Sequence, residues 1–327
     1  MADLSTTYLG LSLRNPVIVS SSGLTGTLPG VKRCADAGAG AVVLKSLFEE
    51  QIDAEMSTQE EEYEVTMHPE ATEYVQQMGK HIGPTDYLKL VEDAKESAGI
   101  PVIASVNCVS SRWWTDYARQ IQDAGADALE LNLSLMPRSF SQPAQEVERS
   151  LARIIEEVRK QVTIPIAAKI GPYFTSLPYF AAQLRRAGLD AMVLFNRFYQ
   201  LDIDVDKIEL SPGYQFSAAT EIHQTLRWIS ILYDHIGCDL SASTGVHEGT
   251  DAVKLLLAGA RSVQVCSVLY RKSVDHIATI TKDIAAWMDE KGFETIADFR
   301  GKASQAESSV PQAYERLQYI KALTGLS

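Results

Sequence analysis

Eight short apolar segments constrain the fold of this chain more than any other feature of its sequence. Each has the length of a strand and is rich in Val, Ile, Leu or Ala; the segments are residues 16–20, 41–45, 101–105, 128–133, 165–169, 191–196, 239–243 and 263–266. Most are continuously apolar, as expected of strands that are buried on both faces. The sequence therefore predicts a parallel sheet with helices covering it.

A helix-to-strand junction recurs four times along the chain. It reads AGAGAVVLK from Ala37, AGADALELN from Ala124, AGLDAMVLFN from Ala187 and AGARSVQVC from Ala258. In each copy the glycine can end a helix in the left-handed conformation before the chain turns into a strand. Eight strands with this junction favour an α/β fold, a parallel (β/α)8 TIM barrel, with an open doubly wound sheet as the alternative.

The helical pattern between the strands is clearest at residues 145–162. Apolar side chains recur there at helical spacing among Glu, Arg and Lys, at Val147, Leu151, Ile154, Ile155 and Val158. The 327 residues fit one barrel, because such domains routinely exceed about 250 residues. We therefore expect residues 1–327 to form a single domain.

Charge and cysteine content restrict the class of partner. The formal net charge is −12, which disfavours nucleic acid and anionic membrane surfaces because both attract clustered positive charge. The N-terminus shows neither a signal peptide nor a membrane span, so we expect a cytoplasmic protein that binds a small molecule. The cysteines lack metal-ligand spacing, so we expect no metal site and no disulfides.

Polar residues follow nearly every predicted strand, where a barrel places its chemistry. Lys45 and Lys169 each follow four apolar residues, and a buried ammonium is costly without a partner. Small residues after the last two strands offer backbone amides where barrels commonly bind a phosphate. The strand-end residues are Ser20, Ser21, Ser22, Gly23, Lys45, Ser46, Asn107, Cys108, Asn132, Ser134, Lys169, Asn196, Arg197, Ser243, Thr244, Gly245, Cys266 and Ser267.

Several segments resemble the dihydroorotate dehydrogenase family and the related flavin domain of dihydropyrimidine dehydrogenase. They extend over nearly the full chain: NPVIVSSSGL from Asn15, GAGAVVLKS from Gly38, VIASVN from Val102, DAGADALELNLS from Asp123, IPIAAKIGPYF from Ile164, VLFN from Val193, ASTGV from Ala242 and DEKGFETIADFRGKA from Asp289. The chain is most similar to the soluble class, because no amphipathic membrane-docking segment precedes the first strand.

The resemblance implies an FMN-dependent oxidoreductase that acts on a CH–CH group of a pyrimidine-like substrate, and a homodimer. It implies catalytic roles for Lys45, Asn132, Ser134, Lys169 and Asn196. The implied FMN-binding residues are Ser21, Ser22, Gly23, Lys45, Ser46, Asn107, Asn132, Lys169, Asn196, Ser217, Ala218, Ser243, Thr244, Gly245, Cys266 and Ser267. Lys169 is expected beside the flavin ring, where a cation stabilises the negative charge of the reduced form.

The substrate side departs from the family pattern. Family members carry a Cys or Ser base in a loop that reads NLSCPN or NxSSPN, whereas this chain reads NLSLMPRS. Leu135 occupies the position of the base, and leucine cannot accept a proton. Pro137, Gln76 and Arg197 replace an Asn, an Asn and a Ser of the family. Dihydroorotate turnover is therefore in doubt.

Other side chains are candidates for the missing base. Ser134 and Cys108 follow predicted strands, although a serine with no assisting base is a weak one. His81 and His247 fall in predicted loops on the catalytic side, and histidine titrates near neutral pH.

An acidic segment follows the second strand. Residues 46–79 contain ten acidic residues and no Lys or Arg, so they account for most of the net charge. We expect this segment to form a mobile loop insertion over the catalytic face. There it would repel anions or favour a cationic partner.

Two other functions fit the sequence. A barrel lyase or aldolase could use Lys169 or Lys45 to form a Schiff base. A flavin-binding protein could instead have lost substrate turnover. The electron acceptor is not identified, since the chain contains neither an iron–sulfur cysteine cluster nor a nicotinamide fingerprint.

Overall fold

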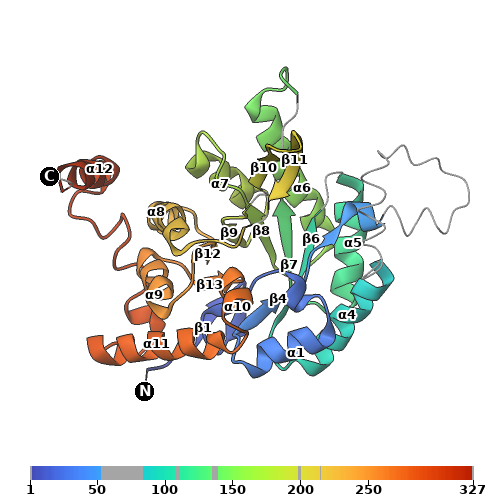
Figure 1. The fold of residues 1–327 in the computed structure, drawn as a ribbon, viewed down its shortest axis with the longest axis horizontal. Helices are drawn as coiled ribbons and strands as arrows, with labels where there is room; N and C mark the ends of the chain where they lie inside the picture. Colours follow the sequence, from blue (N-terminus) through green and yellow to red (C-terminus); the bar gives the residue numbers. More distant parts are fainter. Residues whose placement is uncertain are drawn as a thin grey trace, which may run out of the picture.

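Eight parallel strands form a closed barrel in the computed structural model, which describes residues 2–52, 84–107, 111–134, 139–197, 200–213 and 215–325 (Figure 1). The barrel strands are β3 (Val17–Val19), β4 (Ala41–Val43), β6 (Val102–Asn107), β7 (Ala128–Leu133), β8 (Ile166–Ile170), β9 (Ala191–Leu194), β12 (Asp239–Ser243) and β13 (Ser262–Val265). They pair in chain order, and parallel pairings of β13 with β3 and of β4 with β6 close the ring. The predicted parallel (β/α)8 barrel is confirmed.

Helices surround the barrel, as Figure 1 shows. They are α1 (Leu28–Asp36), α4 (Pro84–Ser97), α5 (Ser111–Asp123), α6 (Ala144–Gln161), α7 (Leu177–Arg186), α8 (Ile222–Leu232), α9 (Gly249–Ala258), α10 (Ser267–Arg271) and α11 (His276–Lys291). The predicted helix over residues 145–162 is α6. In the described part of the chain, no helix is long and apolar enough to span a membrane.

The repeated junction has the predicted backbone conformation in all four copies. The φ angles are 97° at Gly38, 92° at Gly125, 102° at Gly188 and 122° at Gly259. These positive values favour glycine, because a Cβ atom is strained in this region. Each glycine lies one or two residues beyond the end of its helix and just before β4, β7, β9 or β13.

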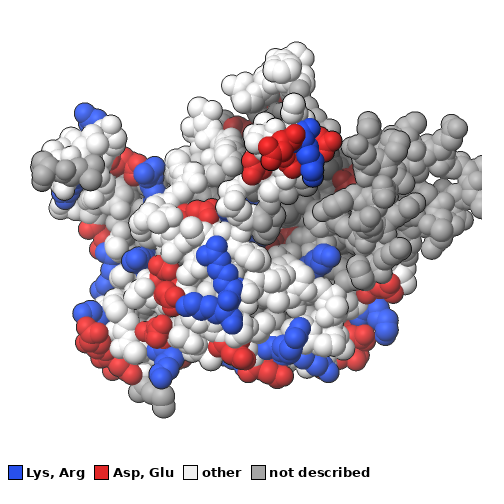
Figure 2. Space-filling model, viewed as in Figure 1, with Lys and Arg blue, Asp and Glu red and all other residues white. Residues whose placement is uncertain are grey.

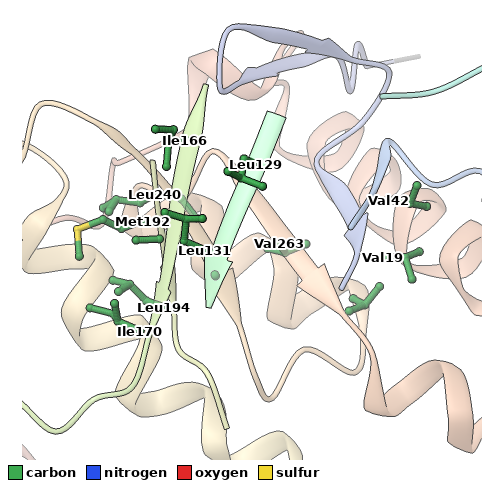
Figure 3. Packing of buried hydrophobic residues seen from close by; sticks show 14 of the residues in the cluster. Val19, Val42, Leu129, Leu131, Ile166, Ile170, Met192, Leu194, Leu240 and Val263 are labelled. Carbon is green, nitrogen blue, oxygen red and sulfur yellow. The ribbon is translucent and has the colours of Figure 1, made fainter. Parts of the chain in front are cut away.

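Alternate side chains of each strand face the helices and the barrel interior. The outward-facing residues form one large buried cluster with the helices (Figure 3). The inward-facing residues near the strand starts, such as Ile18 and Ile103, form a second cluster. Further along the strands the interior becomes polar, with Glu130, Lys169 and Gln264 all buried. Apolar side chains therefore fill the barrel interior at one end, and polar side chains line it at the other.

A hairpin closes the apolar end. Strands β1 (Thr6–Tyr8) and β2 (Leu11–Leu13) pair antiparallel, and Tyr8, Leu9 and Leu13 join the inward-facing apolar cluster. Because this hairpin covers the N-terminal ends of the strands, the polar part of the barrel interior is reached from the other end.

Two further segments stand out from the barrel. Strands β10 (Gln200–Asp204) and β11 (Glu209–Gly213) form a projecting antiparallel hairpin on which Figure 2 shows a group of acidic side chains. Helix α12 (Tyr314–Thr324) lies apart from the barrel in Figure 1. Most of the acidic segment predicted to cover the catalytic face, residues 53–79, lies outside the described residues.

Candidate active site

Two adjoining cavities lie at the C-terminal ends of the strands. One is lined mainly by residues after β9, β12 and β13: Ser20, Ser21, Lys169, Phe195, Asn196, Arg197, Ser217, Ser243, Thr244, Gly245, Val246, Gln264, Cys266 and Ser267. The other is lined by Ser21, Ser22, Gly23, Lys45, Ser46, Phe48, Glu130, Asn132, Lys169 and Asn196. We call them the serine-rich cavity and the lysine cavity. Ser21, Lys169 and Asn196 line both.

Lys169 lies at the junction of the two cavities. Its side chain comes from β8 and is 7% exposed. The ammonium Nζ donates hydrogen bonds to Ser20 Oγ at 2.8 Å and to Gln264 Oε1 at 3.2 Å. These contacts hold the cation at a fixed place beneath both cavities.

Two buried polar residues beneath Lys169, Glu130 and Gln264, were not predicted from the sequence. Gln264 Nε2 donates to Glu130 Oε2 at 2.7 Å, and Ser20 Oγ lies 3.1 Å from Gln264 Oε1. Glu130 and Gln264 are 1% and 2% exposed. The sequence did contain a signal for them: Glu130 stands within the predicted strand ALELNL, and Gln264 within VQVC. A polar side chain inside a buried strand needs a polar partner, so two such residues could have been expected to interact.

Two asparagines face each other across the lysine cavity. Asn196 Nδ2 donates to Asn132 Oδ1 at 2.8 Å, and Asn132 pairs in register with Lys169. This hydrogen bond orients Asn132 so that its own Nδ2 can donate to a ligand. The amide of Ser134 donates to the Asn132 carbonyl, and Asn107 ends β6 opposite Phe48.

Hydroxyl groups connect the first three barrel strands. Ser46 Oγ lies 3.0 Å from Ser21 Oγ and 2.7 Å from Ser105 Oγ, and the Ser46 amide donates to Ser21 Oγ at 2.9 Å. Ser22 caps the short 3₁₀ helix at Gly23–Thr25. The loop after β3 is thus fixed to the loop after β4, which carries Lys45.

The serine-rich cavity is built from small and hydroxyl residues. The Ser217 amide donates to Ser267 Oγ at 3.1 Å, which joins the loop before α8 to the start of α10. Thr244 has a φ of 76°, which is unusual for a β-branched residue, and its hydroxyl donates to the Phe195 carbonyl at 3.1 Å. Strain of this kind often occurs at ligand-binding sites.

Arg197 lines the serine-rich cavity and not the lysine cavity. Its Nε donates to Glu221 Oε2 at 2.8 Å, and its guanidinium also donates to the Gln215 carbonyl. Glu221 Oε1 accepts from the Ala218 amide at 2.7 Å. Although burial raises the pKa of Glu221, hydrogen bonds from Arg197 and the Ala218 amide bring it below the ordinary value. Arg197 therefore fixes the loop that carries Ser217.

His247 and Cys266 both lie near this loop. His247 is buried and its Nε2 lies 3.3 Å from Ser217 Oγ. Burial, together with the charge of Arg271, lowers the pKa of His247, so the ring is neutral at pH 7. Burial raises the pKa of the Cys266 thiol against the effect of Lys169.

The structure brings most of the predicted site residues together. All of them line one or both cavities except Asn107, Ser134 and Ala218, which lie nearby on β6, after β7 and in the loop before α8. Leu135, Pro137, Gln76, Cys108 and His81 lie outside the described residues. Among the described residues, no cluster of His, Cys, Asp or Glu could hold a metal ion.

Comparisons with known proteins agree with this architecture. The model of the family described as dihydroorotate dehydrogenase matches residues 3–288. A protein of Thermoplasma acidophilum named dihydroorotate dehydrogenase B (NAD(+)), catalytic subunit, is 27% identical over 93% of this chain and 99% of its own length. The protein of the same name from Methanothermobacter thermautotrophicus is 26% identical over 92% of this chain and 98% of its own. The chain belongs to the dihydroorotate dehydrogenase family.

Proposed function

We propose that this chain, over residues 1–327, is a single FMN-binding barrel domain that oxidises or reduces a CH–CH group of a pyrimidine-like substrate. The observation that carries the proposal is the position of Lys169, a buried cation at the junction of two cavities in a barrel of this family. The family membership supports an oxidoreductase. The cofactor and the substrate are the proposed part.

The serine-rich cavity fits the phosphate of FMN. Its hydroxyl groups come from Ser217, Ser243, Thr244 and Ser267, and Arg197 adds a cation. No Asp or Glu is among the described residues that line it. Hydroxyl and guanidinium groups are donors that bind phosphate oxygens, and Glu221, which pairs with Arg197, is not among the residues that line this cavity.

The lysine cavity fits the reacting edge of the ring and the substrate. Bound FMN would supply the acceptor for a hydride from the substrate carbon. Lys169 would stabilise negative charge on the reduced ring, because it is buried and its charge is poorly screened by water. Asn132, oriented by Asn196, would donate a hydrogen bond that positions the substrate.

A lysine-dependent lyase fits the geometry less well. A Schiff base forms from a neutral amine. Lys169 Nζ is held by two hydrogen-bond acceptors and lies 3.8 Å from the Glu130 carboxylate, so it would have to give up these contacts to attack a carbonyl carbon.

The cofactor assignment is tested by the visible spectrum of the purified protein and by mass spectrometry of the released cofactor. We expect a yellow protein that releases FMN. Released FAD would contradict the phosphate assignment, whereas a colourless protein that borohydride traps with a carbonyl compound would support the lyase.

The substrate assignment is tested with dihydroorotate. Loss of a general base typically lowers a rate by a factor of about 10² to 10⁴. With Leu135 at the position of the base, we expect dihydroorotate to reduce the flavin far more slowly than dithionite does in stopped-flow measurements. Leu135→Cys alone should restore little, since Gln76, Pro137 and Arg197 also differ from the family pattern. Equal rates in the unmutated protein would show that another residue is the base.

The proposal includes a cytoplasmic homodimer. Hairpin β10–β11 exposes Leu201, Ile203 and Leu210 by 57% to 70%, and the register places Ile203 opposite Leu210 on one face. Exposed apolar faces often mark a surface that another chain covers. Light scattering should give the mass of a dimer, and Ile203→Glu should give a monomer. A monomer of the unmutated protein at micromolar concentration would refute this part of the proposal.

A further inference from the structure

Glu130 is a buried acid that the proposed chemistry does not use. It lies on β7 two residues before Asn132, so both side chains face the barrel interior. One oxygen, Oε2, accepts the hydrogen bond from Gln264. The other, Oε1, lies 3.8 Å from Lys169 Nζ and has no hydrogen-bond partner among the described residues.

A carboxylate at 1% exposure is costly unless an opposite charge compensates it. Lys169 is the cation within ion-pair distance. The lysine already has two neutral acceptors, Ser20 and Gln264, so the carboxylate is not needed to satisfy its hydrogen bonds. What the carboxylate adds is negative charge next to the cation.

We propose that Glu130 is a positioning residue that acts on the Lys169 ammonium in two ways: it orients Gln264, which holds the ammonium, and its negative charge offsets that of Lys169. In this way Glu130 sets the reduction potential of the bound flavin. The inference rests on the proposed FMN site. The reduced ring carries negative charge, which a nearby cation stabilises and a nearby carboxylate destabilises. Glu130 also lines the lysine cavity, so its charge acts on the same space as Lys169.

The hydrogen-bond pattern fixes this arrangement. Gln264 accepts from Lys169 with its carbonyl oxygen and donates to Glu130 with its amide nitrogen. The orientation of the Gln264 amide is therefore set by a donor on one side and an acceptor on the other. A glutamine at position 130 can still accept from Gln264, so Glu130→Gln removes the charge while it keeps the contact.

The experiment measures the midpoint potential of the flavin in the holoprotein by dye-referenced reductive titration. For Glu130→Gln we expect the affinity for reduced FMN, relative to oxidised FMN, to rise at least tenfold. This equals an increase of about 30 mV for a two-electron couple. Glu130→Asp withdraws the charge from Lys169 by one methylene, and we expect a smaller shift of the same sign.

Glu157→Gln is the matched control, because Glu157 forms an exposed pair with Lys160 at 2.7 Å on α6. We expect no shift in this variant. An unchanged or lower potential in Glu130→Gln would overturn the inference without contradicting FMN binding. If only Glu130→Asp folds, the same result in that variant would overturn it. An unmutated protein that binds no FMN would overturn the proposed function and this inference with it.

Discussion

Replacing Lys169 with methionine should destabilise the folded protein, because the buried carboxylate of Glu130 loses its cationic partner. Methionine has nearly the length of lysine but no charge. In this variant Glu130 keeps only the hydrogen bond from Gln264, at 1% exposure. Breaking a buried ion pair by removing one partner typically costs about 3 to 5 kcal/mol. Solvent screening does not reduce this value much, because both side chains are buried.

The expected change in melting temperature follows from the size of the chain. Unfolding entropy is about 2.1 cal/mol/K per residue, which gives about 0.7 kcal/mol/K for 327 residues. A loss of about 3 to 5 kcal/mol therefore lowers the melting temperature by about 4 to 7 °C. Differential scanning calorimetry on the purified variant measures this shift directly.

The double variant Lys169→Met, Glu130→Gln tests the cause. If the destabilisation comes from an unpaired carboxylate, removing that charge should recover most of the lost melting temperature. Coupling energies between residues in contact reach about 0.5 to 3 kcal/mol. A double variant whose loss equals the sum of the two single losses would refute the ion-pair reasoning and would indicate a packing defect instead.

Two further predictions concern stability. Gly259→Ala should lower the free energy of unfolding by about 3 kcal/mol or more, because φ is 122° and a Cβ atom would lie 2.3 Å from the Tyr233 ring. Gly292→Ala is the control, because its Cβ atom would meet nothing within 4 Å. Thermal unfolding should show a loss of about 1 kcal/mol for this control. Because the pKa of His247 is lowered in the folded protein, the unfolded chain binds more protons, and stability should fall as the pH drops below about 6.5. His247→Gln should flatten this pH dependence and exposed His235→Gln should not; equal slopes for the two variants would contradict the assignment.

The fold was predictable because its signals are local. Most barrel strands are short apolar runs, and each of the four repeated junctions contains a glycine whose φ proved to be positive. Hairpin β10–β11 was missed because the strands were predicted from continuous apolar runs, whereas its apolar residues, such as Ile203 and Leu210, alternate with polar ones, a pattern that is also typical of a strand. The sequence does not show that the apolar face of the hairpin is exposed.

The residues of the candidate site at the strand ends were predictable from the sequence, but those deeper in the barrel interior were not. The rule that barrels place chemistry after each strand led to Lys169, Asn132 and Asn196. The contacts of Lys169 with Glu130 and Gln264 join strands that are far apart in sequence, and only the closed barrel brings them together. Arg197 was expected on the substrate side from its place after the sixth strand; in the structure it pairs with Glu221 and lines the serine-rich cavity.

The proposed function keeps the flavin side of the site and changes the substrate side, and the division between strands and loops offers a physical reason why one chain can do both. The residues proposed to govern the ring, such as Lys169 and its partners, come from strands whose neighbours on both sides are buried. Substitution there disturbs the barrel itself. Two residues that depart from the family pattern fall in the sequence between barrel strands: Gln76 between β4 and β6, and Leu135 between β7 and β8. Substitutions in such connecting segments generally cost little stability. A barrel of this family can thus acquire a new substrate through its loops while the barrel interior continues to set the properties of the cofactor.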